Sequence, residues 1–95
     1  VNLPYGMEFN YKGFENRFYK MGVALGLGSN SAAKVIPYLF ELNNELGLPT
    51  RLRDIGVEES HVETLSKLAI EDFCHPSNPK PVAKADFEAL YRKAL

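Results

Sequence analysis

The sequence has 95 residues, which is enough for one small domain and no more. Hydrophobic residues make up 45% of the chain and charged residues 24%, a composition typical of folded globular proteins and too apolar for disorder. The formal net charge of -1 argues against a nucleic-acid-binding protein, and no apolar run is long enough to predict a transmembrane helix. The single cysteine excludes an internal disulfide and fits the reducing cytoplasm, where we expect the protein.

The chain begins at Val1 without an initiator methionine or a signal-peptide pattern, so we expect further residues upstream of it. The apolar segment from Val1 to Phe9 has the composition of the tail of a buried helix, although Pro4 and Gly6 interrupt it. Residues 10–13 (Asn-Tyr-Lys-Gly) predict a turn.

Two amphipathic segments follow. From Phe14 to Leu25 the apolar residues recur at helical spacing, and Gly26 and Gly28 are expected to end that helix. A second helix is predicted from about Ser31 to Leu46, with N-cap oxygens available at residues 29–31. Its predicted apolar stripe consists of Ala32, Val35, Ile36, Leu39, Leu42 and Leu46. Pro37 lies inside this segment and should kink or split the helix.

Residues 48–57 predict a short extended or single-turn connector that carries Arg51, Arg53 and Asp54. One interpretation is a solvated loop with an internal ion pair worth under about 1 kcal/mol. The other is that an arginine caps helix carbonyls or faces a neighbouring domain. A helix-turn-helix reader of DNA is disfavoured, because no helix has a basic recognition face.

The second half of the chain predicts two more helices. The third runs from about Glu58 to Glu71, and its start is ambiguous. Either acidic residues at positions 58 and 59 favour the helix dipole, or Ser60 and Glu63 form a capping box. His61 is expected to be solvated, and the predicted inward residues are Val62, Leu65, Leu68, Ala69 and Phe73.

The last helix is predicted from Lys84 to Ala94, with a Glu88–Arg92 pair on its outer face. No segment shows the alternating pattern of a β-strand. The predicted fold class is therefore all-α: a small bundle of four to five short helices that forms a single helical domain, or part of one, over residues 1–95.

The loop from Asp72 to Val82 joins these two helices and contains three prolines within six residues, which rules out helix there. Cys74 and His75 are adjacent, and adjacent residues rarely direct their side chains at each other, so a nucleophile–base pair is disfavoured. His61 and His75 lie fourteen residues apart and match no metal-ligand spacing. A Cys–His pair that completes a metal site with residues outside this chain is the less favoured alternative.

Three stretches together resemble a known family. They are residues 3–10 (LPYGMEFN), residues 45–57 (ELGLPTRLRDIGV) and residues 72–81 (DFCHPSNPKP). The chain resembles, in the same order, the C-terminal end of the iron-containing (group III) alcohol dehydrogenases. That family shows a Leu-Pro-His/Tyr-x-Met-x-Phe-Asn segment and a helix ending in Leu-Gly-Ile/Leu-Pro-Thr before Leu-Arg-Asp/Glu-x-Gly-Val. An Asp-x-Cys-x-x-x-Asn-Pro-Arg/Lys loop and a terminal helix complete the pattern.

The resemblance implies a two-domain enzyme that interconverts alcohols with aldehydes or ketones by hydride transfer. An N-terminal domain would bind NAD or NADP, and a helical domain would hold Fe²⁺ or Zn²⁺. The family's metal ligands and glycine-rich nucleotide motif lie upstream of the segment that matches Val1. We therefore assign no catalytic, cofactor-binding or metal residue here and expect no activity from this chain alone. The nucleotide-binding domain and the metal-ligand region are expected to be absent from it.

Three positions carry over from the resemblance. Cys74 matches a cysteine that lines the substrate side of the cleft in some members, and Asn78 and Pro79 match the loop that shapes that region. Ala83 stands where relatives often have a threonine N-cap, so the last helix should begin less sharply, at a cost of about 1 kcal/mol.

The expected partners are the missing N-terminal part of the enzyme, or a second copy bound through the apolar segment Val1–Phe9. A small alcohol or aldehyde would be the substrate of the full enzyme, and neither nucleic acid nor membrane is expected. The alternative hypothesis is a stand-alone helical protein-interaction module without catalysis.

Overall fold

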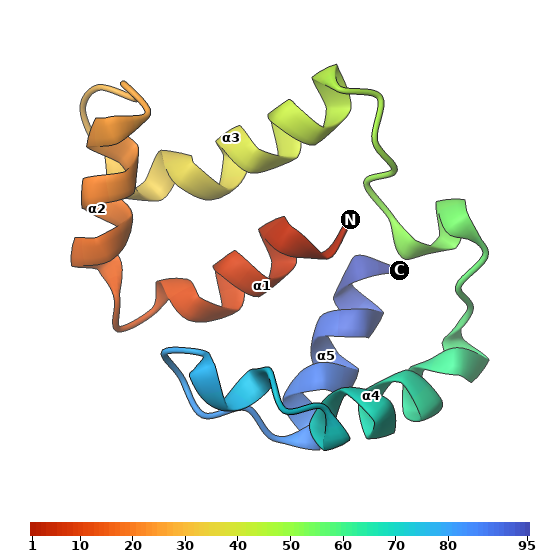
Figure 1. The fold of residues 1–95 in the computed structure, drawn as a ribbon. Helices are drawn as coiled ribbons and strands as arrows, with labels where there is room; N and C mark the ends of the chain where they lie inside the picture. The colour runs from red at the N-terminus through yellow and green to blue at the C-terminus, as the bar shows by residue number, and fades with distance from the viewer. The chain divides into compact units, whose positions relative to one another are not determined.

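The computed structural model describes residues 1–95 and is all-helical, with no β-strand (Figure 1). The α-helices are α1 (Asn2–Tyr11), α2 (Glu15–Ala24), α3 (Ser31–Glu45), α4 (Val62–Glu71) and α5 (Lys84–Ala94). Three short 3₁₀ helices are η1 (Leu52–Ile55), η2 (Glu59–His61) and η3 (His75–Ser77). The all-α prediction is confirmed. None of these helices is long and apolar enough to cross a membrane.

The helices group into two compact units, Val1–Thr50 and Arg51–Leu95. The expectation that residues 1–95 form a single domain stays a prediction.

Helix α1 runs without a break through Pro4 and Gly6 and ends only at Tyr11. The predicted interruption and the predicted turn at residues 10–13 were therefore wrong, apart from the turn at Lys12 and Gly13. Pro4 is the third residue of the helix, where a backbone N–H has no intrahelical acceptor. Its missing N–H consequently removes no helical hydrogen bond.

Helices α2 and α3 meet at a tight corner. Gly26 and Gly28 have φ of 70° and 74°, a left-handed conformation that glycine adopts without strain, so the predicted stop after α2 is confirmed. Gly22 lies against the start of α3, where an added Cβ would come within 2.5 Å of the Ser31 carbonyl oxygen. Only a residue without a side chain allows this approach.

The start of α3 does not follow the predicted capping. Asn30 occupies the N-cap position with φ of 55°, and no side-chain hydrogen bond caps the helix. Ser31 is instead fully buried, and its hydroxyl donates to the Tyr19 carbonyl oxygen at 3.4 Å. The Ser31 side chain is therefore used to join α3 to α2 rather than to cap α3.

Helix α3 continues through Pro37, so the predicted split does not occur. Proline removes the one hydrogen bond to the Ala33 carbonyl, while the turns on either side keep theirs. Val35, 1% exposed, confirms the centre of the predicted apolar stripe, whereas Leu46 is 63% exposed and was wrongly placed inside. Leu46 is the C-cap residue, beyond the last turn of the helix.

The second unit begins with η1, the single turn that the sequence allowed in the connector. Leu52 is buried there, and the arginines on either side of it point to the end of α5. Arg51 Nη1 donates to the Lys93 carbonyl oxygen at 3.4 Å, and Arg53 Nε donates to the backbone oxygen of Leu95. The interpretation of an arginine that caps helix carbonyls is thus confirmed, and no ion pair with Asp54 forms.

Helix α4 follows directly on η2, whose N-cap is Glu58 and whose first turn contains Glu59, so the start with acidic residues at positions 58 and 59 is confirmed and the Ser60–Glu63 capping box is not. The amide of Glu58 donates to Nδ1 of His61 at 3.0 Å, so the imidazole occupies the place that a capping-box carboxylate usually takes. His61 is exposed, as expected, but hydrogen-bonded. Val62 is buried, whereas Leu68 (58% exposed) and Phe73 (89% exposed) were wrongly predicted to face inward.

Helix α5 has the predicted bounds, and it packs against α4. The amide of Ala83 donates to Asp86 Oδ2 at 2.8 Å, so the acidic half of a capping box compensates for the missing threonine. The predicted Glu88–Arg92 pair is present at 3.6 Å. It belongs to a chain of ion pairs in which Arg92 also contacts Glu59, and Lys84 contacts both Glu63 and Glu88.

Candidate functional site

The loop from Asp72 to Val82 forms a turn between α4 and α5. Its prolines exclude an α-helix, as predicted, but residues 75–77 still form one turn of 3₁₀ helix, η3. The Ser77 hydroxyl donates to the Cys74 carbonyl oxygen at 2.7 Å, and the backbone N–H of Asn78 donates to the His75 carbonyl oxygen at 3.0 Å. These local hydrogen bonds hold the turn that presents Cys74.

Cys74 is exposed, and it is hydrogen-bonded to Asp72. The Cys74 backbone N–H donates to Asp72 Oδ1 at 2.8 Å. The hydrogen bond between the thiol and the carboxylate holds the pKa of the Asp72 carboxyl below its usual range. The same contact raises the pKa of the Cys74 thiol, because the nearby carboxylate disfavours a second negative charge. The thiolate needed for nucleophilic attack is thereby disfavoured.

His75 is turned to the backbone of α4 and to the ring of an α5 residue. Its Nε2–H donates to the Ile70 carbonyl oxygen at 2.9 Å, since a carbonyl can only accept. Its ring lies edge-to-face with Phe87, with the centroids 6.0 Å apart. These contacts give His75 a structural task in joining the loop to both helices.

The side chain of Asn78 forms a hydrogen bond within the loop. Its Nδ2 donates to the Lys80 carbonyl oxygen at 2.9 Å, across Pro79. An asparagine side chain that bonds a backbone group two residues on is a common means of shaping a turn. It stays a prediction that Cys74 lines a substrate pocket and that Asn78 and Pro79 shape the loop beside it.

The side chains of this chain do not fit a metal ion. Nowhere do three or more histidine, cysteine, aspartate or glutamate side chains gather so that they could hold one. The hydrogen bond of His75 to the Ile70 carbonyl oxygen further occupies Nε2 of the one histidine in the loop. No step of metal chemistry can therefore be assigned to residues of this chain.

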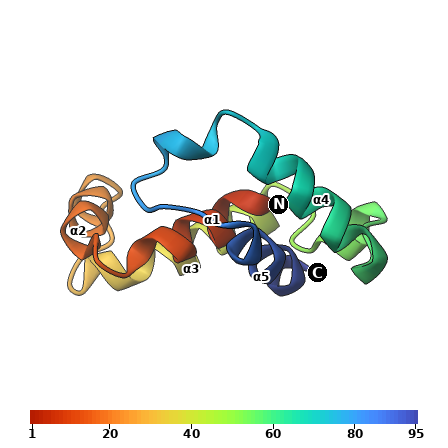
Figure 2. The ribbon, with the colours of Figure 1, turned by 90° about the horizontal axis from the view of Figure 1, so that it is seen from below.

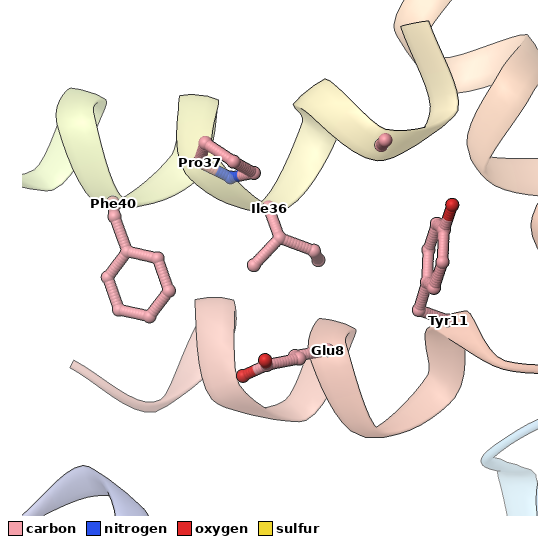
Figure 3. A pocket seen from close by; sticks show the side chains of 6 residues that line it. Glu8, Tyr11, Ile36, Pro37 and Phe40 are labelled. Atoms are coloured by element: carbon pink, nitrogen blue, oxygen red, sulfur yellow. The ribbon is translucent and has the colours of Figure 1, made fainter. Parts of the chain in front are cut away.

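A hollow lies elsewhere, between α1 and α3 of the first unit, which run side by side in Figure 1 and overlap in the view of Figure 2. Two edge-to-face ring pairs, each with centroids 5.1 Å apart, join α1 to its neighbours: Tyr5 with Phe40, and Tyr11 with Phe18. Between them is an open groove of about 490 Å³, with Ile36 above Glu8 (Figure 3). The lining residues are Glu8, Tyr11, Ala33, Ile36, Pro37 and Phe40.

No sequence pattern predicts this groove. Glu8 and Tyr11 lie three residues apart on α1, and Ile36 and Phe40 four residues apart on α3. Such spacings place each pair on one helix face, but they do not say that the two faces meet. A groove between helices depends on tertiary packing, which no local pattern states.

The family model that describes the C-terminal part of the Fe-containing alcohol dehydrogenase family matches residues 1–95. The chain belongs to the iron-containing alcohol dehydrogenase family. The resemblance of the three sequence stretches is thereby confirmed.

Several curated proteins are similar over nearly the whole chain. The NAD-dependent methanol dehydrogenase of Bacillus methanolicus is 33% identical, covering 100% of this chain and 26% of that protein. The lactaldehyde reductase of Escherichia coli K12 is 33% identical, over 99% of this chain and 26% of that protein. The NADPH-dependent butanol dehydrogenase of Clostridium saccharobutylicum is 29% identical, over 96% of this chain and 26% of that protein. The chain therefore spans about a quarter of the length of these relatives.

Proposed function

We propose that this chain is part of the helical domain of an NAD(P)-dependent, metal-dependent alcohol dehydrogenase that interconverts alcohols with aldehydes or ketones. The observation that carries the proposal is the family match over all 95 residues. Two relatives support a nicotinamide cofactor, since one is named as NAD-dependent and the other as NADPH-dependent. When bound, an Fe²⁺ or Zn²⁺ ion of such an enzyme would polarise the substrate oxygen during hydride transfer.

The proposed contribution of this chain is one wall of the substrate cleft, made by the loop from Asp72 to Val82. Cys74 suits such a wall because it is exposed on a turn that hydrogen bonds hold in place. Its raised pKa keeps the thiol neutral and suits a surface that contacts substrate without attacking it. Asn78 and Pro79 shape the same turn.

The chain by itself is proposed to be inactive, because its side chains do not gather into a metal site. Its proposed partner is the part of the enzyme that precedes this segment in the relatives. Self-association through the segment Val1–Phe9 is the other proposed contact, although Leu3 is its one strongly exposed large apolar side chain. A cytoplasmic location stays a prediction.

A chimeric enzyme tests the proposal. Residues 1–95 would replace the matching segment of the E. coli lactaldehyde reductase, and NAD(P)H oxidation would be followed with lactaldehyde and with longer aldehydes, with Fe²⁺ or Zn²⁺ added. The chimera should turn over aldehyde, whereas the 95-residue chain alone should not. Turnover by the isolated chain, or a folded chimera inactive with every aldehyde and metal, would contradict the proposal.

The cleft wall has its own arm in that experiment. Cys74→Phe in the chimera should lower kcat/KM for the longer aldehydes by about tenfold or more, because the added ring would occupy space that those substrates need. The matched control is Leu68→Phe, at an exposed position on α4. Equal kinetics of both variants with short and long aldehydes would remove Cys74 from the cleft.

A further inference from the structure

The two histidines of the second unit use their rings in opposite ways. Nδ1 of His61 accepts a hydrogen bond from the backbone N–H of Glu58 at 3.0 Å, because an N–H can only donate. Nε2 of His75 instead donates to the Ile70 carbonyl oxygen at 2.9 Å. Both nitrogens of a protonated imidazole carry a hydrogen. Protonation therefore preserves the bond of His75 but removes the acceptor on which the bond of His61 depends.

The hydrogen bond of His61 closes the start of a helix. Glu58 is the N-cap of η2, and η2 leads directly into α4. The His61 ring reaches back to the Glu58 amide as the glutamate or glutamine of a capping box does. A carboxylate or amide oxygen accepts at any pH near neutrality, whereas imidazole ordinarily changes its charge between about pH 5 and about pH 8. This helix start consequently depends on an acceptor that mild acid can remove.

We propose that His61 makes the start of α4 a pH-sensitive switch, closed while its imidazole is neutral and open once the ring is protonated. In the closed state Nδ1 holds the Glu58 amide, and the single ring proton lies on Nε2. In the open state no lone pair is left for that amide. The new positive charge also lies at the end of the helix where the dipole is itself positive. Both effects favour opening, and neither depends on the proposed catalytic role of the enzyme.

The charges near His61 favour the open state once the ring is protonated. The charged residues of this turn, and of the ion pairs that reach it from α5, are Glu58, Glu59, Glu63, Lys84, Glu88 and Arg92. Four of them are acidic and two are basic, so an imidazolium here is surrounded by more negative than positive charge. His61 is exposed, so its ring can turn to a carboxylate without disturbing the core.

The packing limits how far the opening spreads. Val62, the first residue of α4, is 1% exposed and anchors that helix. Loss of the His61 bond should therefore loosen η2 and leave α4 folded. Glu59 belongs to η2, so its contact with Arg92 at 2.7 Å should weaken as η2 opens. The contact of Arg92 with Glu88 lies within α5 and should persist.

Amide exchange measured by NMR on the 95-residue chain tests the switch. Protection of the Glu58 amide, corrected for the intrinsic effect of pH, should fall about fivefold from pH 8 to pH 5, the size expected for loss of a typical helix cap. His61→Gln supplies an uncharged acceptor and should give the same protection at both pH values. His61→Ala should give low protection at both. His75→Gln keeps a donor for Ile70 and should behave as the unchanged chain does.

Each alternative outcome overturns the proposal. Constant protection of the Glu58 amide in the unchanged chain would mean that protonation does not open the turn. An equal fall in His61→Gln would assign the pH response to another group, and its disappearance in His75→Gln would assign it to His75. Undiminished protection in His61→Ala at pH 8 would show that the ring does not hold the amide.

Thermal unfolding provides a second measurement. The unchanged chain should melt at a lower temperature relative to His61→Gln as the pH falls, because only the unchanged chain loses its cap. The gap between the two melting temperatures should widen by about 4–8 °C from pH 8 to pH 5. The same gap at both pH values would contradict the switch.

Discussion

The two units of the chain hold their helices together by different means. In Val1–Thr50 the helices meet mainly through apolar and steric contacts: Phe18 is 2% exposed, two aromatic pairs join α1 to its neighbours, and Gly22 lets α2 touch α3. In Arg51–Leu95 the fully buried side chains are smaller, such as Val62 and Ala94. Exposed ion pairs and helix-capping hydrogen bonds supplement them there.

Because of this difference, the stability of the two units should depend on different variables. Close packing leaves no room for an added atom, so the first unit should be sensitive to side-chain volume. Exposed ion pairs are screened by salt and are individually weak, so the second unit should respond, modestly, to ionic strength. Two measurements test the contrast and a third tests the electrostatics of the Cys74 loop in the second unit, in order of decreasing effect.

The largest effect is expected from Gly22→Ala. The new Cβ would lie 2.5–2.6 Å from backbone and Cβ atoms of Ser31, so the α2–α3 corner must shift, at a cost of about 1–3 kcal/mol. Gly6→Ala is the matched control, because its Cβ meets nothing within 4 Å and should stabilise α1 by about 0.5–1 kcal/mol. Urea unfolding followed by circular dichroism measures both variants. If the two variants shift the midpoint in the same direction, the steric account of this corner is wrong.

A smaller effect is expected from Arg92→Ala in the second unit. It removes the contacts of Arg92 with Glu59 (2.7 Å) and Glu88 (3.6 Å). The melting temperature should fall slightly in dilute buffer, and the difference should vanish near 1 M NaCl, where the screening length is about 3 Å. Lys67→Ala removes an exposed lysine of α4 and is the control for loss of one charge. A difference that persists in 1 M NaCl would show that the ion pairs are not what Arg92 contributes.

The smallest effect concerns reactivity rather than folding. Asp72 raises the pKa of Cys74, so less thiolate is present at a given pH than an isolated cysteine would have. Asp72→Asn should lower that pKa and move the pH profile of iodoacetamide labelling to lower pH. Asp54→Asn, on η1, is the control. An unchanged profile after Asp72→Asn would mean that the carboxylate does not act on the thiol.

The same pair has a consequence for stability at acid pH. The pKa of Asp72 is lower in the folded chain than its ordinary value of 3.8. The carboxylate therefore stabilises the fold above that ordinary pKa, and the contribution disappears as the pH falls through the lower folded value. Any difference in stability between Asp72→Asn and the unchanged chain should accordingly be present at neutral pH and vanish in acid.

The candidate loop was easier to predict than the groove. Three prolines within six residues predict a loop. The spacing of Cys74, Asn78 and Pro79 in that loop is part of the family resemblance. The task of His75 was not predictable, because its bond partner Ile70 and its ring partner Phe87 are brought to it by the turn and by α5. The groove escaped prediction because its two walls come from separate helices.

Local sequence by itself determined the helical class, the stop at Gly26 and Gly28 and the bounds of α5, since periodicity, left-handed glycines and helix starts act within a few residues. Tertiary structure decided that Ser31 is buried, that Leu68 is exposed, and that α3 continues through Pro37. It also turned Arg51 and Arg53 to the end of α5, 42 residues away in the sequence. Such outcomes depend on which face of a helix meets a neighbour, and that choice is made by the packing of the whole unit.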